Sequence, residues 1–483
     1  MLRALSLALI SACALPGVDP GPRRPHIVVI LADDLGQGDL GCYNAASKIP
    51  TPNMDRVAAE GTRFTDAHSP SAVCTPTRYG LLTGRYAWRS RLKAWVLNGN
   101  SRALIEPGRP TIASLLQERG WATQVVGKWH LGLGDTQPTD YSKPITRGPL
   151  EVGFDHAFIF PASLDMEPYL YIVDHEAETP PTAEIAGSEH RRKGGGGFWR
   201  KGRAAPGWDM AGVLPRLADE ACERISAHSE ENPNQPLFLY LPLTAPHTPW
   251  LPTEEWAGKT TVSHYGDFVA QVDGVVGQVL ATLEAKGMAE NTLLIVTSDN
   301  GSHWPTEDIE RYEHEANNHR RGQKADIHEG GHRIPFLARW PGRVPAREVS
   351  DELICLTDLY ATIAHLTGET PTTGGEDSYD CSSHLLGERA QAPIRDSLIH
   401  HSGNGMFAIR RGPWKLITEH GSGGFTKPAN RKAADGEPPG QLYHLADDPT
   451  ESRNLWDANP EVVTQLTDLL DEQKRSDRSA PAP

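Results

Sequence analysis

The sequence predicts an α/β fold: a large, mainly parallel sheet covered by helices on both faces, followed by a smaller C-terminal subdomain with an antiparallel sheet and a helix. Three observations predict it. Short apolar runs of strand length alternate with helix-like stretches, the runs end in polar residues, and after residue 385 the strand-like runs follow each other closely. A chain of 483 residues is long enough for one large domain and a lesser companion.

Four apolar runs fit buried parallel strands: HIVVILAD, TQVVGK, PLFLYLPL and NTLLIVTS. Helix-like stretches lie between them, at residues 111–120 and 265–287. The second stretch carries apolar residues at helical spacing and stops at a glycine. Strand, helix and strand in alternation indicate parallel strands with helices packed on both faces of the sheet.

Each of these four runs ends in polar residues. Ligands of parallel sheets bind beyond the carboxyl ends of the strands, so these side chains should meet around one crevice. Taken singly, each has a structural explanation, such as a turn, a helix cap or a satisfied histidine. Four strands that end alike favour a functional site. The residues are Asp33, Asp34, Lys128, His130, His247, Asp299 and Asn300.

Three carboxylates and one amide oxygen in this set are hard ligands, which select Ca²⁺ or Mg²⁺ over Zn²⁺. With one dication and the cations of Arg78, Lys128 and Lys324, the crevice carries a local positive charge. Such a site suits a tetrahedral oxyanion, a sulfate or phosphate monoester. The whole chain, by contrast, has a net charge of −15, which argues against nucleic acid or an anionic membrane surface as its main partner.

Residues 1–20 are predicted to be an export signal, with one arginine, a short apolar run and small residues. Two cleavage patterns are open: a lipoprotein box that leaves Cys13 lipidated, or ordinary cleavage after the Ala12-x-Ala14 pattern. Either one places the protein outside the cytoplasm, in the periplasm, lipid-anchored at the cell envelope, or secreted. A lipid anchor at Cys13 is the only membrane contact expected, because no later segment is long and apolar enough to span a bilayer.

The remaining cysteines are scattered and form no CxxC pair, so neither a zinc site nor a dense disulfide framework is indicated. One disulfide among Cys42, Cys222, Cys355 and Cys381 is open. Cys74 stands apart, because Pro76 and Arg78 follow it at once.

The segment from Cys74 to Arg78, CTPTR, followed by YGLLTG, resembles the signature of the type I, formylglycine-dependent sulfatases of the alkaline phosphatase superfamily. Thr77 stands where serine is commoner in that family. Other landmarks occur in the family's order: DD, GKWH, PH, DNG, RGQK with EGG, and the C-terminal block at residues 441–456. The segments SLDMEPYLYI and EGGHRIPF resemble those of bacterial carbohydrate sulfatases and arylsulfatases.

The resemblance implies that a formylglycine-generating enzyme oxidises Cys74 to Cα-formylglycine, or 3-oxoalanine, whose aldehyde hydrates to a gem-diol. One hydroxyl of the diol attacks sulfur and expels the substrate alcohol. The second hydroxyl then loses its proton and the C–O bond breaks, which releases sulfate and restores the aldehyde.

The resemblance also implies a role for each residue of the site. One Ca²⁺, with Mg²⁺ as the alternative, is held by Asp33, Asp34, Cys74, Asp299 and Asn300. Arg78 orients the diol, and Lys128 and Lys324 neutralise the sulfate oxygens. His130 is the base of the elimination step; His247, with Lys324, protonates the leaving oxygen; and Ser163 helps to bind the diol.

The predicted function is hydrolysis of sulfate monoesters on a sulfated small molecule or glycan. Two alternatives are open: a phosphate or phosphonate monoester hydrolase of the same superfamily, and a non-catalytic glycan-binding protein with an unmodified cysteine. The sugar and the position of its sulfate are open. Further side chains could contact a sugar, although packing explains each equally well: Trp199, His303, Trp304, His400 and His401.

The catalytic domain is expected at residues 23–385 and the C-terminal subdomain at 395–475, with a frayed tail at 476–483. The subdomain is predicted to hold two strands around the turn Gly403-Asn404-Gly405 and a closing amphipathic helix. The basic, glycine-rich residues 176–203 are predicted to be a mobile surface loop, with a lid over an anionic substrate as the alternative.

Overall fold

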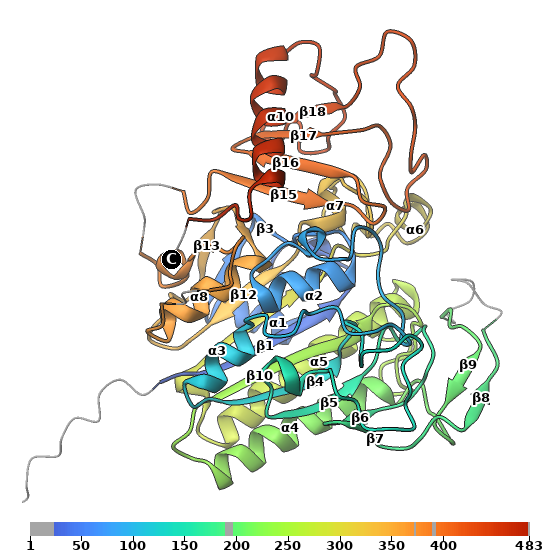
Figure 1. Ribbon diagram of the computed structural model, residues 1–483, viewed down its shortest axis with the longest axis vertical. Coiled ribbons are helices and arrows are strands. Elements are labelled where there is room, and N and C mark those ends of the chain that lie inside the picture. The colour runs from blue at the N-terminus through green and yellow to red at the C-terminus, as the bar shows by residue number, and fades with distance from the viewer. Residues whose placement is uncertain (1–23, 189–196, 371–372, 389–392, 482–483) are drawn as a thin grey trace, which may run out of the picture.

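The computed structural model describes residues 24–188, 197–370, 373–388 and 393–481 (Figure 1). The predicted export signal and Cys13 lie outside these residues. Within the described ranges, no helix is both long enough and apolar enough to cross a bilayer.

A ten-stranded sheet forms the centre of the molecule, in the order β13-β2-β12-β11-β1-β10-β4-β5-β6-β7. The five central strands, from β11 to β5, are parallel, and antiparallel pairings join β12 to β11 and β6 to β5. The predicted mainly parallel sheet is confirmed. Its strands are β1 (His26–Asp33), β2 (Thr62–Phe64), β4 (Ala122–Lys128), β5 (His156–Phe160), β6 (Ile172–Val173), β7 (Glu176–Ala177), β10 (Leu237–Pro246), β11 (Thr292–Ser298), β12 (Phe336–Arg339) and β13 (Glu348–Ser350).

Alternate residues of the buried strands point to opposite faces of the sheet and pack in two separate hydrophobic cores. Val28 and Ile30 of β1 pack in one core, while Ile27 and Val29 pack in the other, as the two-residue period of a strand requires. Each core is closed by its own helices, so both faces of the sheet are covered. The first face carries α1 (Pro52–Ala59), α4 (Val213–Glu231) and α5 (Ser263–Ala285), and the second carries α2 (Cys74–Thr83), α3 (Ile112–Glu118) and α8 (Leu359–Leu366).

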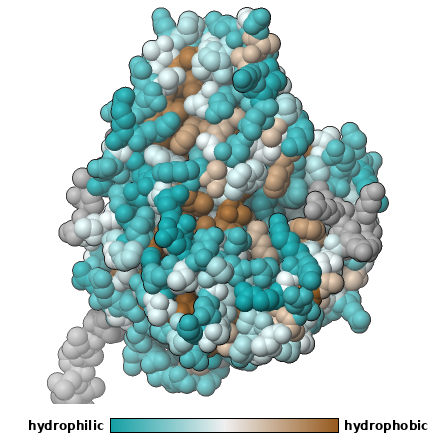
Figure 2. All heavy atoms as spheres, turned by 45° about the vertical axis from the view of Figure 1, so that its right-hand side comes forward, coloured by the Kyte–Doolittle hydropathy of each residue, from teal (hydrophilic) through white to brown (hydrophobic). Residues whose placement is uncertain are grey.

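The C-terminal subdomain is a four-stranded antiparallel sheet with helix α10 (Pro460–Arg475) packed on it through Leu466 and Leu470. The two predicted strands are present as a hairpin, and two more strands extend the sheet beyond them. Figure 2 shows apolar side chains gathered where this narrow upper part meets the wide lower part. The four strands are β15 (Ser397–His401), β16 (Phe407–Arg411), β17 (Trp414–Ile417) and β18 (Gln441–His444).

Short elements complete the fold, and some of them lie within the predicted surface loop. The described part of residues 176–203 contains β7 and a small strand pair. The remaining elements are β3 (Ala67–His68), β8 (Ala183–Ile185), β9 (Gly202–Ala204), β14 (Ile354–Cys355), α6 (Thr306–Tyr312), α7 (Glu329–His332), α9 (Ser382–Leu385), and the 3₁₀ turns η1 (Gln37–Asp39), η2 (Ala87–Arg89), η3 (Leu150–Val152), η4 (Ala289–Asn291) and η5 (Leu356–Asp358).

The described cysteines are all unpaired, so the disulfide left open among four of them does not form in this structure. These thiols are buried or half-buried in the fold. They are Cys42, Cys74, Cys222, Cys355 and Cys381.

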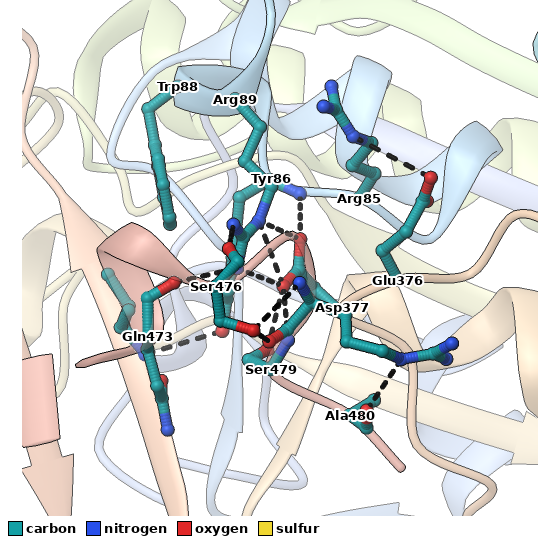
Figure 3. A network of polar contacts seen from close by, with 12 residues as sticks. Arg85, Tyr86, Trp88, Arg89, Glu376, Asp377, Gln473, Ser476, Ser479 and Ala480 are labelled. Atoms are coloured by element: carbon teal, nitrogen blue, oxygen red, sulfur yellow. Dashed lines mark hydrogen bonds and ion pairs between the residues drawn. The ribbon is translucent and has the colours of Figure 1, made fainter. Parts of the chain in front are cut away.

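The end of the chain is bound to the catalytic domain through Asp377, as Figure 3 shows. This buried carboxylate accepts hydrogen bonds from the backbone of Tyr86 at 2.8 Å, from Arg89 at 2.8 and 2.9 Å, and from the hydroxyl of Ser479 at 2.7 Å. Arg89 also donates to the carbonyl of Gln473 at 3.1 Å. The predicted fraying is therefore wrong for residues 476–481, because this buried network holds them.

We expect Asp377→Ala to lower the free energy of unfolding by about 3–5 kcal/mol, because it leaves the buried Arg89 guanidinium without its partner. Urea unfolding measures the change. Asp396→Ala is the matched control: Asp396 pairs with Arg411 at the surface, where an ion pair contributes about 0–1 kcal/mol. Equal losses in the two variants would contradict the role given to Asp377.

Candidate functional site

The predicted acidic residues meet at the carboxyl ends of two neighbouring parallel strands. Ala32 of β1 lies opposite Ser298 of β11, so the residues that follow the two strands are adjacent. The backbone N–H of Asp34 donates to Asp299 Oδ1 at 3.3 Å, and Asn300 Nδ2 donates to Asp34 Oδ1 at 2.7 Å. Segments 265 residues apart in sequence thus form one buried cluster, as the strand-end rule predicts.

Cys74 is the first residue of helix α2 and is buried against the acidic cluster. Its Sγ lies 3.5 Å from Asp33 Oδ1. The helix starts here because Val73 is extended and Pro76 needs no hydrogen-bond acceptor in the first turn. Burial raises the pKa of the Cys74 thiol to about 12. The unmodified side chain is therefore a protonated thiol at neutral pH, which is a weak nucleophile.

Three buried cations face three buried carboxylates, one to one, at this site. The six side chains balance in charge, so a bound dication would leave the site with two net positive charges. Every pair is within hydrogen-bond distance. The pairs are Lys128 Nζ with Asp33 Oδ2 at 2.5 Å, Lys324 Nζ with Asp34 Oδ1 at 2.7 Å, and Arg78 Nη2 with Asp299 Oδ2 at 2.7 Å.

The pairs set the direction of the pKa shift for two of these groups, whereas burial and Asp33 raise the pKa of Asp299 despite its pairing with Arg78. Burial alone would raise the pKa of the Asp33 carboxyl, but Lys128, His247 and Arg78 together lower it below its usual value. Burial likewise works against the charge of Lys324, yet Asp34 outweighs it and raises the pKa of the ammonium. Both groups therefore stay ionised although they are buried.

Arg78 contacts the carboxylate Asp299 and the strand that carries Lys128. Its Nε and Nη2 donate to Asp299 Oδ2 at 3.0 and 2.7 Å, and its Nη1 donates to the carbonyl of Lys128 at 2.8 Å. The predicted contact of Arg78 with the group at residue 74 stays a prediction. The geometry shows a guanidinium that orients one carboxylate and one strand end.

His130 presents one bare ring nitrogen to the site. Its Nε2 lies 2.7 Å from the carbonyl of Leu97, which only accepts, so Nε2 carries the proton. Its Nδ1 is buried and has no hydrogen-bond partner among the described residues. Burial, Lys128 and Arg78 hold the pKa of His130 well below its usual value. His130 is thus a neutral imidazole with a free lone pair, which is what a general base requires.

His247 follows β10 and faces the same cluster. Its Nδ1 donates to the carbonyl of Thr248 at 2.6 Å, and its Nε2 lies 3.8 Å from Asp34 Oδ2. Ligand atoms of Asp33, Asp34, Cys74 and His247 all lie within 4.8 Å of one another. This buried group can bind a metal ion.

Some buried polar atoms of the site have no hydrogen-bond partner and are available to bind a ligand or an ion. Among the described residues, Asn300 Oδ1, His130 Nδ1 and Ser163 Oγ are buried and make no hydrogen bond. Each such atom needs a partner, which a ligand, an ion or water can supply. Ser163 lies near His130, because the His130 N–H donates to the carbonyl of Pro161 at 3.1 Å. The Asn300 oxygen fits the oxygen-rich shell of a hard cation.

Three groups that contribute to the site were not predicted from the sequence. The carbonyl of Leu97 sets the tautomer of His130, and a backbone group leaves no mark in a sequence. Thr75 Oγ1 donates to the carbonyl of His130 at 3.0 Å and ties the helix start to that loop. The hydroxyl of Tyr240, buried and without a partner among the described residues, was equally unmarked. Only Thr75, inside the CTPTR motif, carried a usable signal.

The candidates for sugar contact divide by burial. Trp304 and His400 are 2% and 0% exposed, so they are packing residues. Trp304 stacks on Tyr265 at 4.7 Å between ring centroids. Trp199 donates its indole N–H to the carbonyl of Ala186, and His303 lies against Phe425.

A family model described as Sulfatase matches residues 25–369. The chain belongs to the sulfatase family. The sulfatase is 34% identical to an N-acetylgalactosamine-6-O-sulfatase of Bacteroides thetaiotaomicron, over 94% of this chain and 93% of that one. It is 33% identical to human arylsulfatase A, over 97% of this chain and 90% of that one. The predicted activity, sulfuric ester hydrolysis, is confirmed by this membership.

A solved structure extends the likeness to three dimensions. It comes from work on the metabolism of multiple glycosaminoglycans by Bacteroides thetaiotaomicron, and it matches with a TM-score of 0.84 at 32% identity. The match covers 94% of this chain and 100% of that chain. The C-terminal subdomain is therefore part of the shared architecture.

We expect Arg78→Lys to lower kcat for an aryl sulfate by at least about 100-fold, because lysine cannot hold Asp299 with two donors and the Lys128 carbonyl with a third. Steady-state kinetics with a chromogenic aryl sulfate measure it. Arg339→Lys is the control, since Arg339 is similarly buried but pairs with Glu60, away from the cluster. Undiminished kcat in the Arg78 variant would contradict its positioning role.

Proposed function

We propose that this sulfatase removes sulfate from a sulfated carbohydrate, with Cys74, oxidised to formylglycine, as its nucleophile. The observation that carries the proposal is the buried Cys74 side chain on Asp33, inside a charge-balanced cluster of three cations and three carboxylates. A carbohydrate substrate is supported by the N-acetylgalactosamine-6-O-sulfatase at 34% identity across almost the whole chain.

The chain's own groups suit one Ca²⁺, with Mg²⁺ as the alternative, held by Asp33, Asp34, Asp299, Asn300 and the modified residue 74. The set is rich in oxygen, which a hard cation requires, and Asn300 offers an orphaned buried carbonyl oxygen. When bound, the ion supplies positive charge against the sulfate and acidifies the nucleophilic hydroxyl of residue 74.

The roles of Lys128 and Lys324 follow from their positions. Each ammonium lies on one of two carboxylates, Asp33 and Asp34, that have an oxygen within 4.8 Å of the Cys74 sulfur, so each is within reach of a sulfate group bound there. Their positive charges stabilise the anionic ester and the charge that develops in its transition state. Ser163, whose buried hydroxyl has no partner among the described residues, is proposed to donate to the hydroxyl groups of the hydrated residue 74.

Two histidines move protons in opposite directions. His130, neutral and with a bare Nδ1, accepts a proton from residue 74 in the step that releases sulfate. His247 turns its Nε2 toward the cluster, with Lys324 on the same carboxylate, and gives a proton to the leaving oxygen of the sugar. This division of labour makes one histidine the base and the other the acid.

The proposal includes maturation and export. Residues 1–20 act as an export signal, cleaved or lipidated at Cys13, so the enzyme works in the periplasm, at the cell envelope or outside the cell. A formylglycine-generating enzyme is its maturation partner. The sulfated carbohydrate outside the cell is its substrate.

We expect the tryptic peptide of residues 64–78 to be about 18 Da lighter than its sequence mass, because oxidation replaces –CH₂SH by –CHO. Mass spectrometry of protein produced together with a formylglycine-generating enzyme measures it. Cys74→Ala is expected to abolish aryl sulfate hydrolysis and to leave the peptide unmodified. Full activity in protein whose Cys74 is a plain thiol would overturn the proposed nucleophile.

We expect dialysis against a chelator to abolish activity and lower Tm, and Ca²⁺ to restore both, since a cation at 100 times its Kd stabilises the fold by about 2.7 kcal/mol. Thermal scans at matched Ca²⁺ and Mg²⁺ concentrations show which ion is preferred. Asn300→Ala is expected to raise the Ca²⁺ concentration needed for half-activation. Activity that survives chelation unchanged would count against the metal.

A further inference from the structure

Trp95 and Phe425 form an exposed aromatic surface next to the catalytic site. Their rings stack at 6.0 Å between centroids with an interplanar angle of 26°, and they are 43% and 38% exposed. His303 lies against Phe425 at 4.9 Å. We call these three rings the aromatic platform. Among the described residues, only Val349 joins Trp95 and Phe425 as an exposed large hydrophobic side chain.

The backbone holds Trp95 in a conformation that bulky residues rarely adopt. Its φ angle is 56°, in the left-handed region, and its N–H donates to the carbonyl of Gly403 at 2.6 Å. A strained residue that also exposes a large apolar ring is typical of a binding surface rather than of a packing position.

The platform is joined to catalytic residues by short stretches of chain. Leu97, whose carbonyl holds His130, is two residues from Trp95. Gly424, which precedes Phe425, lies so close to the backbone of Ala325 that a Cβ atom there would come within 2.3 Å of it. Ala325 follows the catalytic Lys324. The platform therefore borders the site on the side of Lys324 and His130.

A pocket of about 630 Å³ lies beside the platform, and Lys93 and Ala94, which directly precede Trp95, are part of its lining. It lies between the loop at Lys93, the β15–β16 hairpin and the end of α10. Gly405 of the hairpin lies close to this loop, because a Cβ atom on it would come within 3.1 Å of the carbonyl oxygen of Lys93 and 3.6 Å of the Ala94 side chain. Because Lys93 and Leu97 are four residues apart, their Cα atoms are at most about 14 Å apart. The basic pocket is lined by Arg85, Trp88, Arg89, Lys93, Ala94, His401, Asn404, Gly405, Phe407, Lys474, Arg475, Ser476 and Asp477.

The pocket carries positive charge that the protein does not neutralise. Arg85 and Arg89 are paired with Glu376 and Asp377, as Figure 3 shows. No carboxylate of the described residues forms an ion pair with the other three cations, and Asp477 is the one acidic residue in the lining. An uncompensated positive site in a chain of net charge −15 indicates an anionic ligand. The three cations are Lys93, Lys474 and Arg475.

Two of these cations, Lys93 and Lys474, lie close enough to the buried His401 to shift its pKa. Burial, Lys93 and Lys474 lower the pKa of His401 to about 4. His401 is therefore neutral at neutral pH and adds no charge to the pocket. Lys474 also lies over the ring of Phe407, 4.4 Å from its centroid, which fixes the ammonium inside the pocket.

We propose that the aromatic platform and the basic pocket form a second subsite, which binds a neighbouring anionic sugar of a polymeric sulfated substrate. The platform stacks against the apolar C–H face of a sugar ring, and the cations of the pocket bind the sulfate or carboxylate of the next one. The inference rests on the proposed carbohydrate substrate. It adds that the enzyme prefers a multiply charged chain over a single sulfated sugar.

The test compares the binding of a polymeric ligand with the hydrolysis of a small substrate by the mature enzyme. Lys474→Gln/Arg475→Gln and Trp95→Ala should each weaken binding of a chondroitin sulfate hexasaccharide by about tenfold, the loss of one or two charge-assisted contacts or of one stacked ring. Calorimetry measures the Kd on Cys74→Ala forms of each protein, which do not hydrolyse the hexasaccharide. Hydrolysis of a chromogenic aryl sulfate should stay within about twofold of wild type, because that substrate does not reach the pocket.

The control is Arg119→Gln/Lys286→Gln. It removes two charges at the C-terminal ends of α3 and α5, which lie by the amino ends of the parallel strands, opposite to the site. Its hexasaccharide Kd should equal that of the wild type. A Kd unchanged in either test variant, equal weakening in the control, or no binding by the wild type overturns the second subsite. If the mature wild type does not hydrolyse the aryl sulfate, the proposed function is refuted instead. The two failures are distinguishable because the Kd is measured separately from catalysis.

Discussion

The site depends on the balance between three buried cations and three buried carboxylates. Burying any one of these ions alone would be very costly, so each needs its partner in the folded chain. Together they create a cluster that is neutral by itself and becomes positive when a dication joins it. An acidic protein can hold an anionic ester at such a place because the local field of a buried site outweighs the distant net charge.

The sheet explains how distant residues reach this cluster. Parallel strands put all their carboxyl ends at one edge, so β1, β4, β10 and β11 deliver their following residues to a common point. Two of those residues, Asp34 and His130, have φ angles of 69° and 56° in the left-handed region. The chain turns sharply there, directly after a regular strand, and the surrounding packing holds the turn.

Much of this architecture could be predicted, because strand-length apolar runs, their polar ends and the CTPTR motif are all properties of side chains in order. The clustering of Asp33 and Asp34 with Asp299 and Asn300 followed from strand topology alone. The one-to-one pairing of charges could not be predicted, since it depends on side-chain positions in space. Backbone contributions were equally hidden, as the carbonyl that orients His130 shows. The tail was mispredicted, because its composition looks unstructured while a buried carboxylate elsewhere holds it.

Asp377 joins segments that are far apart in the sequence. Ser479 follows Asp377 by 102 residues, whereas Arg89, which binds the same carboxylate, precedes it by 288. A growing chain cannot form the contact with Ser479 until the residues beyond helix α10 have been synthesised. Until then the C-terminal helix lacks its final anchor, so the C-terminal subdomain and the catalytic domain are expected to reach their native arrangement together, as one cooperative unit, rather than one after the other.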